Sequence, residues 1–122
     1  MATIVGYTTI KFTDEEMADF VSRIGEAVVT ALELPPQMKD VTIINVPEAN
    51  HTVKPYGHIT FFAYTAPGKS VEKKRAMIRG VQDTVDEFFG DRAQVRTVVI
   101  IKEHSDENVG VGGVLRADAK KQ

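Results

Sequence analysis

The sequence contains no cysteine and no tryptophan, and neither sign of charge dominates it. The absence of cysteine excludes a disulfide framework and a cysteine nucleophile. Lysine and arginine number 15 against 17 aspartates and glutamates, which gives a formal net charge of -2. A domain that binds nucleic acid through a basic face usually carries a clear excess of positive charge, so we expect no nucleic-acid partner.

Long apolar runs are also missing, and no stretch approaches the roughly 20 apolar residues of a membrane-spanning helix. The first residues show no basic segment followed by an apolar one, so we expect no secretory signal and a cytoplasmic location. The 122 residues are 43% hydrophobic and 26% charged, a composition typical of a globular protein with one core.

The chain repeats itself, and the repeat becomes visible when Thr13 is placed on Ser70. In this alignment the apolar positions of the first half, Phe20, Val21, Ile24, Val28, Ala31 and Leu32, fall on Met77, Ile78, Val81, Val85, Phe88 and Phe89. Apolar residues that recur every three or four positions predict an amphipathic helix in each half.

The ends of these helices are marked by local signals. Thr13 and Glu16 form the S/T-x-x-E pattern of a capping box, which predicts the start of the first helix. Pro35-Pro36 and Gly90 predict where the first and second helices end. Runs of β-branched and aromatic residues predict strands at 3–10, 41–46, 59–65 and 95–102.

The order strand, helix, strand therefore occurs twice. We expect a single α+β domain, residues 1–122, made of two β-α-β units (1–57 and 58–116) and a C-terminal tail. Each unit is long enough for a right-handed crossover between parallel strands, which predicts a four-stranded mixed sheet with both helices on one face. The strand at 59–65 is apolar on both faces, so self-association through the bare face is expected. The alternative is a monomer that tolerates exposed apolar residues.

Few residues suggest chemistry by themselves. His51 and His58 do not have the spacing of a zinc site and His104 stands alone, so we expect neither a metal nor another cofactor. The glycine-rich segment 110–113 lacks the ending of a phosphate-binding loop and predicts a tight turn. Lys69 precedes the second helix, where a lysine and free backbone amides can meet a carboxylate.

The turn Gly68-Lys69-Ser70, the tail motif Glu107-Asn108-Val109-Gly110-Val111-Gly112-Gly113 and the tandem duplication together resemble the tautomerase superfamily. The second half is especially similar to the short 4-oxalocrotonate tautomerases, and the whole chain resembles the longer, fused members. The resemblance implies a trimer of fused chains and a small carboxylate substrate. It also implies an amino-terminal proline that acts as general base or acid, and arginines that hold the substrate carboxylate.

This chain departs from that pattern in several positions. Ala2 stands at the proline position, so removal of Met1 would expose a primary amine as the catalytic base. Lys69 replaces the arginine of the second unit, whereas the first unit has Phe12 there and Lys11 one residue earlier. The resemblance implies that Lys69, with Lys11 or Arg96, binds the carboxylate. Val109 takes the place of a bulky aromatic in the pocket wall.

The predicted activity is therefore keto–enol isomerisation of small 2-oxo or 2-hydroxy-unsaturated acids. One alternative is a non-catalytic or differently specialised member that has lost the proline. A dehalogenase is disfavoured because Ala66 or Pro67 stands in place of that family group's second arginine, and a decarboxylase is disfavoured because Met38 stands in place of an acidic residue. The element order also fits a ferredoxin-like domain, which the order of the strands would distinguish.

Overall fold

A four-stranded mixed sheet is the centre of the computed structural model, which describes residues 2–119. Its strands are β1 (Ala2–Thr8), β2 (Val41–Asn45), β3 (Gly57–Thr65) and β4 (Val95–Glu103), in the order β2-β1-β3-β4. β1 is parallel to β2 and β3 is parallel to β4, while β1 and β3 are antiparallel. Two parallel pairs side by side form the arrangement that distinguishes this fold from the ferredoxin-like alternative.

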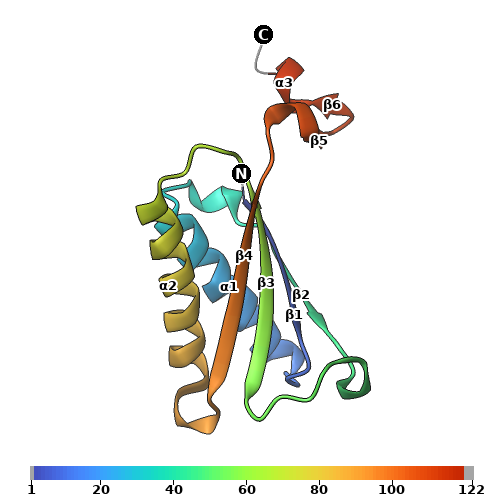
Figure 1. Cartoon of the computed structure of the whole chain (residues 1–122), viewed down its shortest axis with the longest axis vertical. Helices are drawn as coiled ribbons and strands as arrows, with labels where there is room; N and C mark the ends of the chain where they lie inside the picture. Colours follow the sequence, from blue (N-terminus) through green and yellow to red (C-terminus); the bar gives the residue numbers. More distant parts are fainter. Residues whose placement is uncertain (1, 120–122) are drawn as a thin grey trace.

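Both long helices, α1 (Asp14–Ala31) and α2 (Val71–Phe89), cover the same face of the sheet (Figure 1). The predicted α+β fold with two helices on one face is thereby confirmed. Among the described residues, no helix has both the length and the apolar character needed to cross a bilayer.

Short elements complete the chain. Single 3-10 turns are η1 (Pro36–Met38), η2 (Glu48–Asn50), η3 (Gly90–Arg92) and η4 (Asp106–Asn108). The tail contains the hairpin of β5 (Gly110–Val111) and β6 (Val114–Leu115), followed by α3 (Arg116–Ala119). Gly112 and Gly113 have φ of 60° and 83°, so the glycines supply the tight turn expected from the sequence. The tail extends beyond the end of β4 (Figure 1).

The start of α1 has the predicted capping box. The Thr13 hydroxyl accepts a hydrogen bond from the Glu16 amide at 3.1 Å, and the Thr13 amide donates to the Glu16 carboxylate at 2.9 Å. Arg92 also donates to this carboxylate, at 3.2 Å. The backbone hydrogen bond from Thr13, followed by the bond from Arg92, lowers the pKa of Glu16. The cap therefore joins the start of α1 to the turn after α2.

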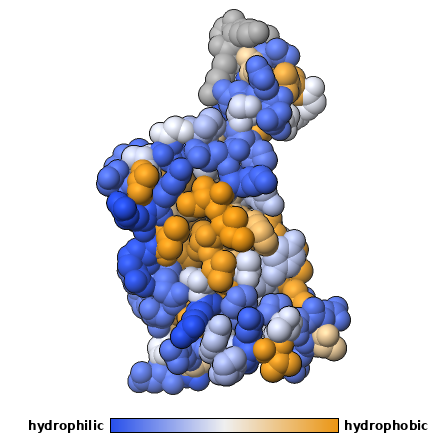
Figure 2. All heavy atoms as spheres, viewed as in Figure 1, coloured by the Kyte–Doolittle hydropathy of each residue, from blue (hydrophilic) through white to orange (hydrophobic). Residues whose placement is uncertain are grey.

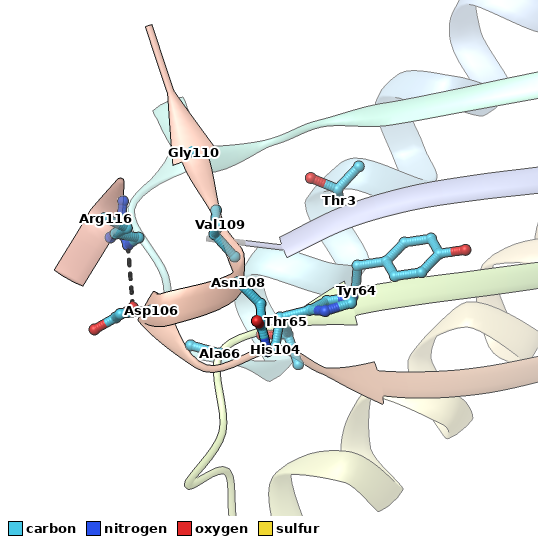
Figure 3. Close-up of a pocket in the computed structure, with 10 residues that line it drawn as sticks. All are labelled: Thr3, Tyr64, Thr65, Ala66, His104, Asp106, Asn108, Val109, Gly110 and Arg116. Atoms are coloured by element: carbon cyan, nitrogen blue, oxygen red, sulfur yellow. Dashed lines mark ion pairs between the residues drawn. The ribbon is translucent and has the colours of Figure 1, made fainter. Parts of the chain in front are cut away.

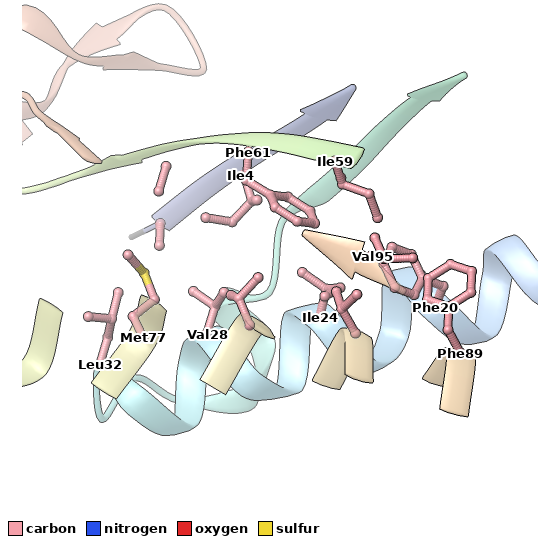
Figure 4. Packing of buried hydrophobic residues seen from close by; sticks show 14 residues of the cluster. Ile4, Phe20, Ile24, Val28, Leu32, Ile59, Phe61, Met77, Phe89 and Val95 are labelled. Atoms are coloured by element: carbon pink, nitrogen blue, oxygen red, sulfur yellow. The ribbon is translucent and has the colours of Figure 1, made fainter. Parts of the chain in front are cut away.

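The core lies between the helices and the sheet (Figure 4). Alternate residues of β1 and β3 point into it, among them Ile4 and Phe61. Phe20 of α1 has no exposed surface, and its ring lies 5.2 Å from that of Phe12 and 5.0 Å from that of Phe88, measured between centroids. The amphipathic pattern predicted this face of each helix, except that Ile78 is exposed.

The opposite face of the sheet has no covering layer within residues 2–119. Val99 and Ile101 of β4 pack against the core, so the alternate residues Val98 and Ile100 project from the other face and are 44% and 46% exposed. Ile44 on β2 is also exposed. Figure 2 shows apolar atoms gathered over the middle of β4. This uncovered face is the surface on which the sequence predicted self-association.

Replacement of Phe20 by alanine tests the importance of the aromatic part of the core. We expect Phe20→Ala to lower the free energy of unfolding by about 3–5 kcal/mol, because it removes a buried ring and leaves a cavity. Urea denaturation measures the change. The control is Val53→Ala, at a loop position that is 92% exposed, which should alter stability by less than about 0.5 kcal/mol. Similar midpoints for the two variants would contradict this view of the core.

Candidate functional site

A cavity of about 330 Å³ lies where β1 begins and β3 ends. Residues from three parts of the chain line it: Thr3 from β1; Tyr64, Thr65 and Ala66 from the end of β3 and the residue after it; and His104, Asp106, Asn108, Val109, Gly110 and Arg116 from the segment after β4 (Figure 3). One wall is therefore the end of the sheet, and the other wall is the C-terminal tail.

Strand register brings these walls together. Ala2 of β1 pairs with Thr65 of β3, and Thr65 pairs in turn with Glu103 of β4. The His104 amide donates to the Thr65 carbonyl at 2.8 Å, which continues the β3–β4 pairing beyond the strand. In the tail, the Arg116 amide donates to the Val109 carbonyl at 2.7 Å. Backbone hydrogen bonds thus fix both walls.

The cavity contains an imidazole, a phenol and an ion pair. The His104 ring stacks on the Tyr64 ring, with centroids 5.4 Å apart and planes inclined by 26°. Arg116 Nε lies 3.6 Å from Asp106 Oδ1 (Figure 3). Both side chains of the pair are partly exposed, so the pair contributes little to stability and the guanidinium remains accessible to an anion.

Two predicted site residues lie at this cavity. Val109 lines its wall. Ala2 immediately precedes the lining residue Thr3 and pairs with Thr65, while its methyl group is buried in the core. Ala2 therefore places its end of β1 beside the cavity. Met1 lies outside the described residues.

Lys69 lies in the turn between β3 and α2, at the same end of the sheet, but it does not line the cavity. Glu103 holds this turn: its carboxylate accepts from the Gly68 amide at 3.2 Å and from Lys74 Nζ at 3.1 Å. Gly68 has a φ of 95°, a conformation that favours glycine. Since Lys74 and Gly68 occupy the Glu103 carboxylate, the Lys69 ammonium remains accessible to another anion.

Lys11 and Arg96 lie at the opposite end of the sheet. Lys11 follows the end of β1, and Arg96 is the second residue of β4, paired with His58. The guanidinium carbon of Arg96 is 4.5 Å from the centroid of the Tyr56 ring. A single chain therefore does not bring Lys11 or Arg96 to the cavity beside Ala2.

Phe12, which the resemblance placed at the position of the first-unit arginine, is packed into the aromatic cluster. Its ring centroid lies 5.2 Å from that of Phe20 and 5.8 Å from that of Phe89. The turn of the first unit thus uses this position for packing.

A second cavity, of about 230 Å³, contains His51, Lys54 and His58 near the start of β3. The two imidazole centroids are 5.3 Å apart. Among residues 2–119, no group of three or more His, Asp or Glu side chains is placed to hold a metal ion. Burial, followed by the charges of His51 and Lys54, lowers the pKa of His58 from its usual 6.5.

Reasoning from the sequence did not identify Tyr64, His104, Asp106 or Arg116 as site residues. His104 stands alone in the sequence because Tyr64 is far from it along the chain. One signal could have linked them: both residues lie at or just after the carboxyl ends of two neighbouring parallel strands, which meet at one edge of a sheet. The sequence carries no such signal for Arg116, because this residue reaches the cavity only through the turn of the C-terminal tail.

Residues 55–119 match the family model described as "Tautomerase enzyme". The chain belongs to the tautomerase family and is of the fused, two-unit type. Comparison with curated proteins gives no match.

Among solved structures, a native fused 4-OT is similar with a TM-score of 0.84 and 20% identity, covering 97% of this chain and 98% of that chain. The R7 fused 4-OT, an asymmetric trimer, has a TM-score of 0.79 and 21% identity, with the same coverage of both chains. A malonate semialdehyde decarboxylase has a TM-score of 0.81 and 15% identity, covering 98% of each chain. These similarities show a shared fold.

The lowered pKa of His58 predicts a dependence of stability on pH. Because the folded protein binds a proton at His58 less readily than the unfolded chain does, stability should fall as the pH drops through about 6.5 toward 5. His58→Gln should reduce this loss, since glutamine does not titrate. Denaturation midpoints at pH 7.5 and pH 5.0 measure the effect. An equal loss in the wild type and in His58→Gln would contradict the prediction.

Proposed function

We propose that this protein is a keto–enol tautomerase that acts on small 2-oxo or 2-hydroxy-unsaturated acids. The main support is the cavity beside Ala2, at the start of β1. The chain that contains this cavity belongs to the tautomerase family. The cavity has a volume of about 330 Å³, which suits a small organic acid. It also contains the kinds of group that this reaction needs, a cation for a carboxylate and titratable groups for proton transfer.

In the proposed reaction, removal of Met1 places the terminal amine at Ala2. An α-amino group has a reference pKa of about 7.7–8.0, so part of it is neutral near pH 7 and can act as a base. The amine takes the proton of the enol hydroxyl, the C=O bond forms, and the electron pair of the C=C bond takes up a proton at carbon from water or from a protein acid. The ammonium then releases its proton to water, so the protein gains no net proton. The mass of the intact mature protein reveals whether Ala2 carries the terminal amine.

Two cations near this end of the sheet are suited to the substrate carboxylate. Arg116 lines the cavity and can form a bidentate contact, although Asp106 competes for it. Lys69 lies in the neighbouring turn, and its ammonium can approach a ligand at the cavity mouth. Positive charge here would also stabilise the enolate as it forms.

We further propose a trimer, in which Lys11 and Arg96 of a neighbouring chain approach the cavity. The uncovered apolar face of the sheet supports self-association, because exposed apolar area of this kind is favourable to bury. The fused 4-OT structures described as trimers share the fold and support the same assembly. The cytoplasmic location stays a prediction.

A binding protein without catalytic activity is the second candidate. Alanine in place of the family's proline favours it, as does the ion pair of Arg116 with Asp106, which occupies a cation in the cavity. Turnover by the wild-type protein separates the two candidates.

We expect the wild type to convert phenylenolpyruvate or a 2-hydroxydienoate to the keto form, followed by ultraviolet absorbance. Lys69→Ala should raise KM roughly tenfold or more, because a hydrogen bond to a charged group contributes about 1.5–3 kcal/mol. The control is Lys73→Ala, since Lys73 Nζ pairs with Glu33 at 3.3 Å and does not line the cavity. Absence of turnover by the wild type would favour the binding protein. Equal KM values for both variants would remove Lys69 from the site.

Charge on the uncovered face should disrupt the proposed trimer. Val98→Asp places a carboxylate on a side chain that is 44% exposed, where burial in an interface would be costly. We expect the wild type to have the mass of a trimer by light scattering and Val98→Asp to have the mass of a monomer. Val53→Asp, on an exposed loop, should remain trimeric. A monomeric wild type would contradict the proposed assembly.

A further inference from the structure

The geometry points to His104 as a catalytic acid of the cavity, a role that rests on the proposed tautomerase function. Imidazole is the side-chain type whose charge changes most readily near neutral pH. Of the residues that line the cavity, His104 is the one with an imidazole, and the other two histidines belong to the second cavity.

The position of His104 is fixed at two points. Its backbone amide donates to the Thr65 carbonyl at 2.8 Å, so its Cα is held to the last residue of β3. Its ring stacks on that of Tyr64, at 5.4 Å and 26°. Aromatic pairs favour particular relative orientations, so this contact orients the ring. An oriented ring within a cavity is suited to proton transfer, which depends strongly on geometry.

The groups around His104 leave its imidazole available. Tyr64 faces it from β3, and Asp106 and Arg116 lie across the cavity in the tail, where they pair with each other at 3.6 Å. The neighbouring residue Glu103 is bound to Gly68 and Lys74. From β1, the proposed amine of Ala2 approaches the same end of the sheet. The arrangement thus provides two separate proton-transfer groups, the amine and the imidazole.

Enol-to-keto conversion moves one proton from oxygen to carbon, and two groups can divide this task. The neutral amine of Ala2 takes the hydroxyl proton while the O–H electron pair forms the C=O bond. The C=C electron pair then forms a new C–H bond with the proton of the His104 imidazolium. The ammonium afterwards loses its proton to water and the imidazole regains one from water, so the protein returns to its starting state.

The test compares His104→Gln and His104→Phe with the wild type on phenylenolpyruvate. Phenylalanine keeps a ring to stack on Tyr64 but carries no titratable proton, so a loss in both variants reports the proton rather than the packing. We expect kcat to fall about 10²–10⁴-fold with little change in KM. In the wild type, kcat/KM should decline at alkaline pH, and this decline should be absent in both variants. His51→Gln, at the second cavity, should keep the wild-type kcat.

Wild-type kcat and pH dependence in both variants would overturn the assignment. A lower kcat with the alkaline decline intact would also overturn it, since His104 would then only support the wall. If the wild type does not turn over the enol, the proposed function fails, and NMR then tests His104 separately. Titration with oxalate should move the imidazole signals of His104 and leave those of His51 in place; unmoved His104 signals would overturn the assignment.

Discussion

The antiparallel pairing of β1 with β3 is the contact on which the rest of the molecule depends. Each β-α-β unit alone has two parallel strands and one helix, and it would leave the free edge of β1 or β3 without a hydrogen-bonding partner. Pairing along the whole of β1 joins the units into four strands, and both helices then share one core. The same register places Ala2 opposite Thr65, so one set of hydrogen bonds creates both the core and the end of the sheet where the cavity forms.

Local signals account for the part of the fold that the sequence predicted. The Thr13 cap, the two prolines after α1 and Gly90 act within a few residues of the boundaries they set, and the structure has boundaries close to those expected. The repeat predicted both helices and their buried faces. Local signals could not predict the order of the strands, because the β1–β3 contact joins residues far apart in the chain. A ferredoxin-like order therefore remained possible until the structure was known.

The candidate site was only partly predictable for the same reason. Ala2 and Val109 were suggested by resemblance; Val109 lines the cavity, and Ala2 immediately precedes the lining residue Thr3. Lys11 and Arg96 lie at the far end because β1 and β4 run in opposite directions, so the end of β1 and the start of β4 share the edge of the sheet opposite Ala2. His104 and Arg116 depend on a ring stack and on the return of the tail, which leave no periodic pattern in the sequence.

The position of Phe12 shows what fusion of the two units makes possible. In an assembly of identical short chains, any substitution in the turn before the helix appears in every unit. The same residue type must then serve in every copy of that turn. In the fused chain the two turns are separate positions. One is part of the aromatic core through Phe12, and the other carries Lys69 on a turn held by Glu103. Fusion therefore lets one turn serve packing while the other presents a cation at the cavity's end of the sheet.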